Sequence, residues 1–154
     1  MPVAARCAAD RQGQTGRIPI VPCDLRAYVI DREPSGLNVR SGPGKTDKAI
    51  GNLPNQEVEG IGVHITGASG EWVRIDRAVE DGGEHERIFF KGEGWVYAPL
   101  FGVGGMAITD CGTNLYQDKT EKSRVIIRVP GGDDCVTVRG CHGQWMYVEY
   151  KKKR

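Results

Sequence analysis

Short runs of alternating apolar and polar residues make up most of the chain, and turns rich in glycine, proline and aspartate separate them. In Leu37–Arg40 the first and third side chains are apolar and the other two are polar, which is the period-two pattern of a half-buried strand. Pro43 then excludes a continuing strand, because proline lacks the backbone N–H through which a strand pairs. The pattern predicts a turn-rich loop over residues 41–48 and a second strand over Ala49–Leu53.

The same alternation predicts strands along the rest of the chain. No segment keeps a 3.6-residue period for more than about two turns, so we predict an all-β protein. Residues 1–22 are predicted to be a flexible leader, in which residues 17–21 are the only strand-like piece. Polar composition predicts a surface excursion over residues 76–86 and a turn at residues 91–93. The further predicted strands are residues 24–30, 58–65, 72–75, 87–90, 94–97, 100–103, 106–109, 114–116, 125–129, 135–139 and 145–150.

The chain repeats itself. Residues 37–54 align without a gap on residues 113–130, and each copy has an asparagine at its second position and a proline at its end. Further on, EWVRI (residues 71–75) matches QWMYV (residues 144–148). Two copies are too few for a solenoid. The repeat therefore predicts two small barrel-like domains in tandem.

Length and charge narrow the function classes. A chain of 154 residues can form one medium domain or two small ones. A net charge of +1 gives no electrostatic preference for nucleic acid or a membrane surface, and the basic run at residues 151–154 is interpreted as a solvated tail. No stretch approaches the roughly 20 apolar residues of a membrane span. The first residues lack the apolar core of a secretory signal, so we expect either a cytoplasmic protein or one whose signal has been removed.

Five cysteines bear on this choice of compartment. Their spacing contains no CxxC and no paired Cys/His cluster, so structural zinc is not expected. Five cysteines in a small, loop-rich chain favour an oxidising compartment with one or two disulfides, and the odd count leaves at least one thiol unpaired or intermolecular. The alternative is that some are small buried apolar residues. The five are Cys7, Cys23, Cys111, Cys135 and Cys141.

Four segments of the first copy carry a family resemblance: LNVRSGPG, IGNLP, GEWVRI and GEGWVYAPLF. They resemble a bacterial SH3-like domain, in which an L-N-V-R-x-G-P stretch opens the domain and a G-W-V strand nearly closes it. The resemblance implies a first SH3-like domain at residues 23–103, a linker at residues 102–105, and a second, incomplete SH3-like domain at residues 106–154. The second copy departs from the pattern, because DKTE replaces the SGPG turn and no G-W-V strand follows Tyr150.

A second barrel without its last strand would expose unpaired backbone groups along an edge. We expect residues 17–21 or the other domain to fill this gap. The alternative is that the native protein continues beyond this sequence.

The resemblance also implies a disulfide. In an SH3-like barrel the strand end at Cys111 and the turn at Cys141 can lie close together, so Cys111–Cys141 is the first choice. A Cys7–Cys23 bond would pin the leader. A Cys135–Cys141 bond is less favoured, because the strand between the two residues would hold their Cα atoms beyond the roughly 7 Å that a disulfide allows.

No set of residues combines into a catalytic constellation. His64 is predicted on a strand, His85 in a polar loop, and His142 in a turn beside Cys141, where sequence neighbours seldom face each other. The acidic residues 80–86 lack the spacing of a Ca²⁺ loop. The glycines at 102–105 have no helix behind them to bind phosphate. We therefore predict a protein that is not an enzyme, with no cofactor and no metal.

Binding remains. The resemblance implies a shallow groove lined by aromatic side chains. For each tryptophan the alternative is packing in the core, and for Arg40 a structural role on the carbonyls of the following turn is slightly favoured. The candidate ligand-binding residues are Asn38, Arg40, Trp72, Trp95, Tyr97, Tyr116 and Trp145.

Two functions fit these expectations. The first is a non-catalytic binding module of the cell envelope, periplasmic or secreted, that recognises peptidoglycan, its peptide stems or an envelope protein. The second is a protein–protein inhibitor or immunity-type partner that uses the tandem barrel surface, with an open strand edge to which a partner adds a strand.

Overall fold

The computed structural model describes residues 18–55, 60–80, 85–102, 113–130 and 136–151, and these form an almost entirely β structure. The predicted all-β fold class is confirmed. The helical turn among these residues is the three-residue 3-10 helix η1 (Ala98–Leu100). Within the same ranges, no helix has the length and apolarity to cross a membrane.

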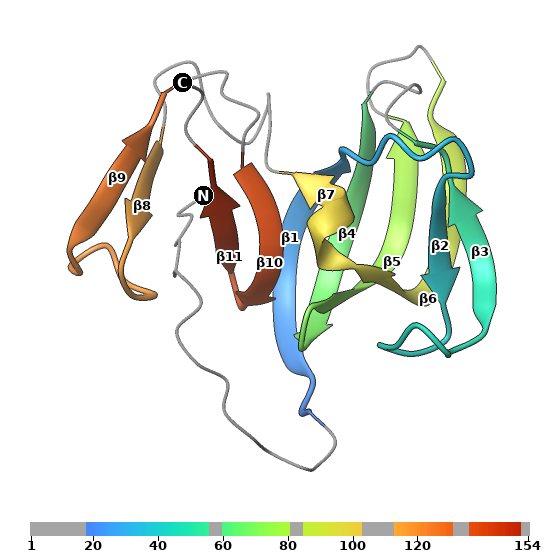
Figure 1. Ribbon diagram of the computed structural model, residues 1–154, viewed down its shortest axis with the longest axis horizontal. Helices are drawn as coiled ribbons and strands as arrows, with labels where there is room; N and C mark the ends of the chain where they lie inside the picture. Colours follow the sequence, from blue (N-terminus) through green and yellow to red (C-terminus); the bar gives the residue numbers. More distant parts are fainter. Residues whose placement is uncertain (1–17, 56–59, 81–84, 103–112, 131–135, 152–154) are drawn as a thin grey trace.

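Nine strands form one sheet, in the order β11-β10-β7-β1-β4-β5-β6-β2-β3. Two more strands, β8 and β9, form a separate antiparallel ribbon, which Figure 1 shows beyond β11. The bounds of the strands are β1 Val21–Val29, β2 Leu37–Arg40, β3 Ala49–Leu53, β4 Ile61–Ser69, β5 Trp72–Glu80, β6 Arg87–Tyr97, β7 Phe101–Gly102, β8 Thr113–Tyr116, β9 Val125–Val129, β10 Val136–His142 and β11 Trp145–Tyr150.

The strand pairings repeat along the chain. Hairpin β8–β9 pairs Thr113 with Val129 and skips a residue after Leu115, and hairpin β2–β3 has the same register and the same irregularity 76 residues earlier. Hairpin β10–β11 reproduces the turn-side part of β4–β5 at an offset of 73 residues, from the pair His142–Trp145 to the pair Val138–Val148, including the skipped residue between Val138 and Gly140. Beyond that pair the registers differ, because β4–β5 has a second irregularity between His64 and Ile65. The tandem second domain stays a prediction, and the shared registers support it.

Strand β6 has no counterpart in the second half among the described residues. In the first half β6 pairs with β5 on one side and with β2 on the other, so it joins the two hairpins into one sheet. In the second half no described strand links β11 to β8, and the ribbon therefore stays separate from the sheet.

Strand β1 connects the two halves. Most of it pairs with β4, but Asp24 donates its N–H to the Gly143 carbonyl (2.9 Å) and Gly143 donates to the Pro22 carbonyl (2.8 Å). Gly143 lies between β10 and β11. The predicted gap-filling segment, residues 17–21, ends in Val21, which pairs with Ala68 of β4. The residues that reach the second half are therefore the next three along the chain.

A disulfide joins Cys23 to Cys141, with 6.0 Å between their Cα atoms. The first-choice pairing of Cys141 with Cys111 is wrong, and so are the alternatives that used Cys23 or Cys141 with other partners. The physical reason is the parallel bridge between Cys23 and Gly143, which holds the start of β1 against the end of β10. Cys7, Cys111 and Cys135 lie outside the described residues.

The hydrophobic core spans both halves. One cluster of buried residues contains Leu37, Leu53 and Phe101 of the first half together with Leu115 and Val148 of the second, all at most 3% exposed. Phe101 lies in β7, which pairs with β1, and Gly102, the next residue of the same strand, is the partner of Thr137 in β10. The core therefore continues from the large sheet to the ribbon.

Several predicted boundaries change. The predicted turn at residues 91–93 is wrong, because β6 runs through it while pairing with β5. The predicted surface excursion begins later, since residues 76–80 belong to β5. Strand β1 begins at Val21, so the last two residues of the predicted leader lie in a strand. Residues 1–17, the predicted strand at 106–109 and most of the predicted linker lie outside the described residues.

Candidate functional site

Along the strands, apolar residues that face the core alternate with residues on the outer face of the sheet, and several of these outer residues are charged. On β1, Leu25 and Ala27 are buried while Asp24 and Arg26 are exposed. On β5 the alternation breaks, and Asp76 and Arg77 are exposed in succession. The pairing of β5 with β6 shifts at this point, which marks a β-bulge. A bulge places an extra residue on the face, so two charged side chains lie there together.

Two arginines, a lysine and a histidine lie in one row across four strands. Arg26 of β1 is the cross-strand partner of His64, His64 is the partner of Arg77, and Arg77 is the partner of Lys91 on β6. Like charges in direct cross-strand positions destabilise a sheet. Counter-charges offset the repulsion at the centre of the row, where Arg77 forms an ion pair with Glu86 and His64 contacts two carboxylates.

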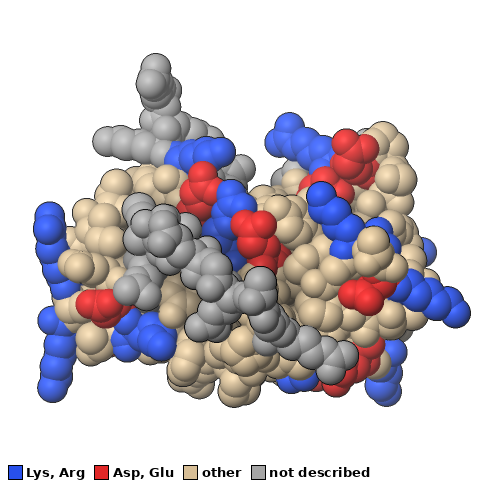
Figure 2. Space-filling view, turned by 60° about the horizontal axis from the view of Figure 1, so that its bottom comes forward, with Lys and Arg blue, Asp and Glu red and all other residues tan. Residues whose placement is uncertain are grey.

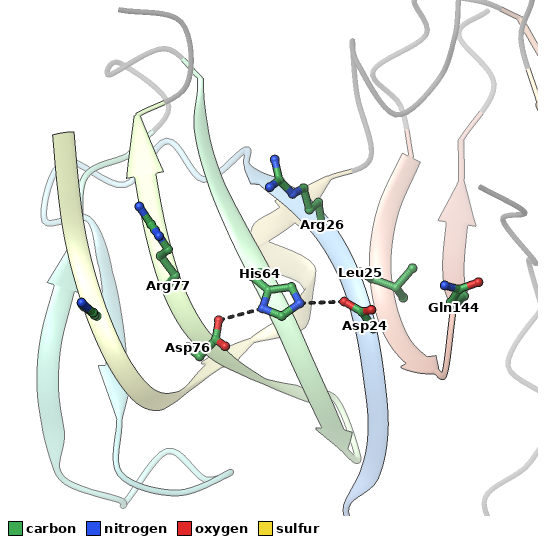
Figure 3. Close-up of a pocket in the computed structure, with 8 residues that line it drawn as sticks. Asp24, Leu25, Arg26, His64, Asp76, Arg77 and Gln144 are labelled. Atoms are coloured by element: carbon green, nitrogen blue, oxygen red, sulfur yellow. Dashed lines mark hydrogen bonds and ion pairs between the residues drawn. The ribbon is translucent and has the colours of Figure 1, made fainter. Parts of the chain in front are cut away.

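His64 lies between Asp24 and Asp76. Its Nε2 is 2.8 Å from Oδ1 of Asp24, and its Nδ1 is 2.8 Å from Oδ1 of Asp76. Figure 3 shows the three side chains in a line across β5, β4 and β1, with Arg77 and Arg26 on the same side of that line. The hydrogen bond to Asp24, and then that to Asp76, raise the pKa of His64, while partial burial opposes them. Two carboxylates favour the charged imidazolium.

These residues line an open hollow of about 520 Å³, which Gln144 from the β10–β11 turn also borders. A smaller hollow of about 170 Å³ continues from it past Tyr28 and Glu86. The formal charges of the lining residues cancel when His64 is neutral, and protonation adds one positive charge. Figure 2 shows basic and acidic side chains interspersed over the face that it presents, without a large area of one sign.

The nitrogens of His64 and the sulfur of Cys141 are already engaged by other groups of the chain. Both ring nitrogens of His64 contact carboxylates, so neither is open to take a proton from a substrate. Cys141 is bonded to Cys23, so it offers no thiolate to the adjacent His142. Within the described part of the chain, no group of three or more His, Cys, Asp or Glu residues could hold a metal ion.

The predicted site residues Trp72 and Tyr97 lie together. They are cross-strand partners at the start of β5 and the end of β6, and their ring centroids are 5.6 Å apart with a tilted geometry. The Tyr97 hydroxyl donates to Glu71 (3.2 Å), and partial burial, together with the Glu71 charge, raises the pKa of Tyr97. Both rings are only half-buried, so they present an aromatic surface beside a carboxylate.

Three other predicted residues lie on β2 and β6. Trp95 is 4% exposed and has the Arg74 guanidinium 5.9 Å from its ring centroid, so it has little surface left for a ligand. Arg40, its partner on β2, donates to the Asp47 carbonyl (2.9 Å). This confirms the structural role in the turn that the sequence favoured for Arg40. Asn38 is exposed and accepts a long hydrogen bond from Asn52 (3.4 Å).

The last two predicted residues, Tyr116 and Trp145, form a second aromatic pair. Their rings meet edge to face with 6.0 Å between centroids, and the contact joins the ribbon to β11. Trp145 is the counterpart of Trp72 in the repeat. In the first half the tryptophan packs on Tyr97 of β6, and in the second half, where no counterpart of β6 is described, Tyr116 of β8 packs on it.

An ion-pair network lies beside the first aromatic pair. Arg139 of β10 contacts Glu149 of β11 and lies 3.6 Å from Glu71, which joins the two halves at the surface. The Arg139 guanidinium lowers the pKa of Glu149, and Glu149 in turn raises the pKa of Arg139.

Sequence reasoning missed the cluster around His64. The histidine was placed on a strand, but its partners depend on two strand registers that contain irregularities. The available signal was the pair of consecutive charged residues, Asp76 and Arg77, after an alternating run, which is a sign of a bulge.

Comparisons with known proteins give one match. A family model of the bacterial SH3 domain matches residues 35–100, which contain β2 to β6 and η1. The match does not extend to the second half of the chain. No curated protein and no solved structure matches this chain.

Proposed function

We propose, from the premise that residues 35–100 are a bacterial SH3 domain, that this protein is a non-catalytic binding module of the bacterial cell envelope that recognises peptidoglycan or an envelope protein. Bacterial SH3 domains are generally binding modules rather than enzymes, and cell-wall ligands are frequent among them. The family match is the observation that carries the proposal.

The two aromatic pairs are the contact surfaces in this proposal. Trp72 with Tyr97, and Trp145 with Tyr116, are half-buried, which leaves ring surface for packing against a sugar or a peptide. Asn38, Arg40 and Trp95 remain proposed neighbours of the ligand, with less accessible surface at Trp95. The Cys23–Cys141 disulfide supports a periplasmic or secreted location, because disulfides persist in oxidising compartments.

Retention on purified, insoluble peptidoglycan tests the proposal. We expect the oxidised protein to sediment with the wall and Trp72→Ala to release it, because the variant removes the larger ring of the half-buried Trp72–Tyr97 pair. Ile126→Ala is the matched control, since it also removes an exposed apolar side chain but lies on the ribbon, outside the aromatic pairs. Equal retention of Trp72→Ala and Ile126→Ala, or no retention of the unaltered protein, would contradict the proposal.

The second candidate, a protein–protein inhibitor or immunity-type partner, has one observation in its favour. Ile50 on β3 and Ile126 on β9 are each 46% exposed at corresponding positions of the repeat. Strand β3 is the last strand of the large sheet, so its outer edge is a place for strand addition. Recovery of one stoichiometric protein partner, lost in Ile50→Lys, would favour this function over wall binding.

A further inference from the structure

The row of cations in the hollow has two members without a partner. Arg26 and Lys91, at the two ends of the row, make no hydrogen bond or ion pair within the described parts of the chain, and both side chains are exposed. The inner members are neutralised, since Arg77 contacts Glu86 and His64 lies between two aspartates. The row therefore offers two separate positive charges rather than one continuous patch.

The separation of these two charges follows from the sheet. Three strand intervals lie between β1 and β6, and each interval is about 4.8 Å, so the two residues are about 14 Å apart along the row. In an extended peptide, side chains four positions apart point to the same face and are also separated by about 14 Å. An extended chain that crosses the strands can therefore place one carboxylate on each cation.

The centre of the hollow offers acceptors. Asp24 and Asp76 each direct Oδ1 to His64, and both side chains are at least half exposed, so a second oxygen of each carboxylate faces solvent. Between its two acidic side chains, a peptide backbone presents N–H groups that can donate hydrogen bonds to these carboxylates. Gln144 adds an amide at the β1 side of the hollow.

We propose that this hollow is a second binding site, which takes an extended acidic segment of a partner protein with two carboxylates four positions apart, one on Arg26 and one on Lys91. This site shares no residue with the aromatic pairs of the proposed function. Its failure in the experiment below would leave wall retention through Trp72 unaffected.

Calorimetric or NMR titration with a blocked five-residue peptide, glutamate at each end and glycine between, tests the proposal. We expect binding that weakens about twofold to fivefold when either glutamate is replaced by glutamine, and by a similar factor in Arg26→Gln or Lys91→Gln, as for exposed ion pairs. A peptide of the same composition with its two glutamates adjacent should bind more weakly than the spaced peptide. All of these side chains are exposed, so folding is not at risk.

Arg124→Gln and Lys122→Gln are the matched controls, because they remove the same charges as Arg26→Gln and Lys91→Gln. Both residues are exposed and lie in the second half, away from the hollow. Equal weakening in the controls, equal binding of the glutamine peptide, or no binding at millimolar peptide would overturn the proposal. If soluble peptidoglycan fragments displaced the spaced peptide and depended on the same two cations, the ligand of the hollow would be peptidoglycan. The proposal that the hollow binds an acidic segment of a partner protein would then be overturned.

Discussion

At the scale of single residues, His64 links pH to stability. Its hydrogen bonds to Asp24 and Asp76 raise its pKa in the folded protein above the ordinary 6.5. A raised folded pKa contributes stability that is fully present below pH 6.5 and is lost as the pH rises through the folded pKa. We therefore expect the free energy of unfolding to lose this contribution on the alkaline side of pH 6.5, and His64→Gln to lose the dependence.

The two aspartates should differ in their effect. Asp24→Asn should lower the pKa of His64 more than Asp76→Asn does, because the hydrogen bond to Asp24 is the largest influence on it. NMR titration of the His64 ring in the two variants measures this directly. A larger drop in Asp76→Asn, or a native pKa at or below 6.5, would show that the line of three residues in Figure 3 does not hold in solution.

Much at this scale could be predicted from alternation alone. The apolar and polar faces of Leu37–Arg40 and the turn role of Arg40 follow from local pattern, and the structure has both. The surroundings of His64 could not be predicted, because they are set by the registers of β1 and β5 against β4. A bulge moves every later side chain to the other face, and the sequence does not say where the bulge falls.

At the scale of elements, β1 is the strand on which the second half depends. The Cys23–Cys141 bond ties residues 118 positions apart, and such a long loop costs the unfolded chain much entropy when it is closed. We expect the double variant Cys23→Ser/Cys141→Ser to lose about 2–5 kcal/mol of unfolding free energy, measured by denaturant titration.

The unaltered protein under reducing conditions is the control for this loss, and its midpoint should shift to match that of the double variant. If the variant were as stable as the oxidised protein, β1 and β10 would be held together by their backbone bonds and core contacts alone. The pairing could not be predicted from cysteine spacing, because it depends on where the start of β1 lies relative to a turn in the second half.

At the scale of the whole molecule, the sequence predicted the internal repeat but not how its two halves pack together. The gapless alignment of residues 37–54 on residues 113–130 predicted two related hairpins, and their registers agree. Two barrel-like domains in tandem were predicted without their packing, and β7, β1 and β10 place both halves in one sheet over one core cluster. Packing between repeats depends on a few residues such as Phe101 and Thr137, which carry no periodic signal.

This shared core leads to a prediction about cooperativity. The Thr137–Gly102 pairing, the Arg139–Glu71 contact and the disulfide all join the two halves. We expect amide hydrogen exchange in β4 and in β10 to report the same free energy of opening in the oxidised protein, since both strands would open only in global unfolding. After reduction, β10 and β11 should lose protection before β4 and β5, because the second half lacks a described strand that joins its hairpins. Faster exchange of β10 in the oxidised protein would mean that the halves unfold independently, as two separate barrels would.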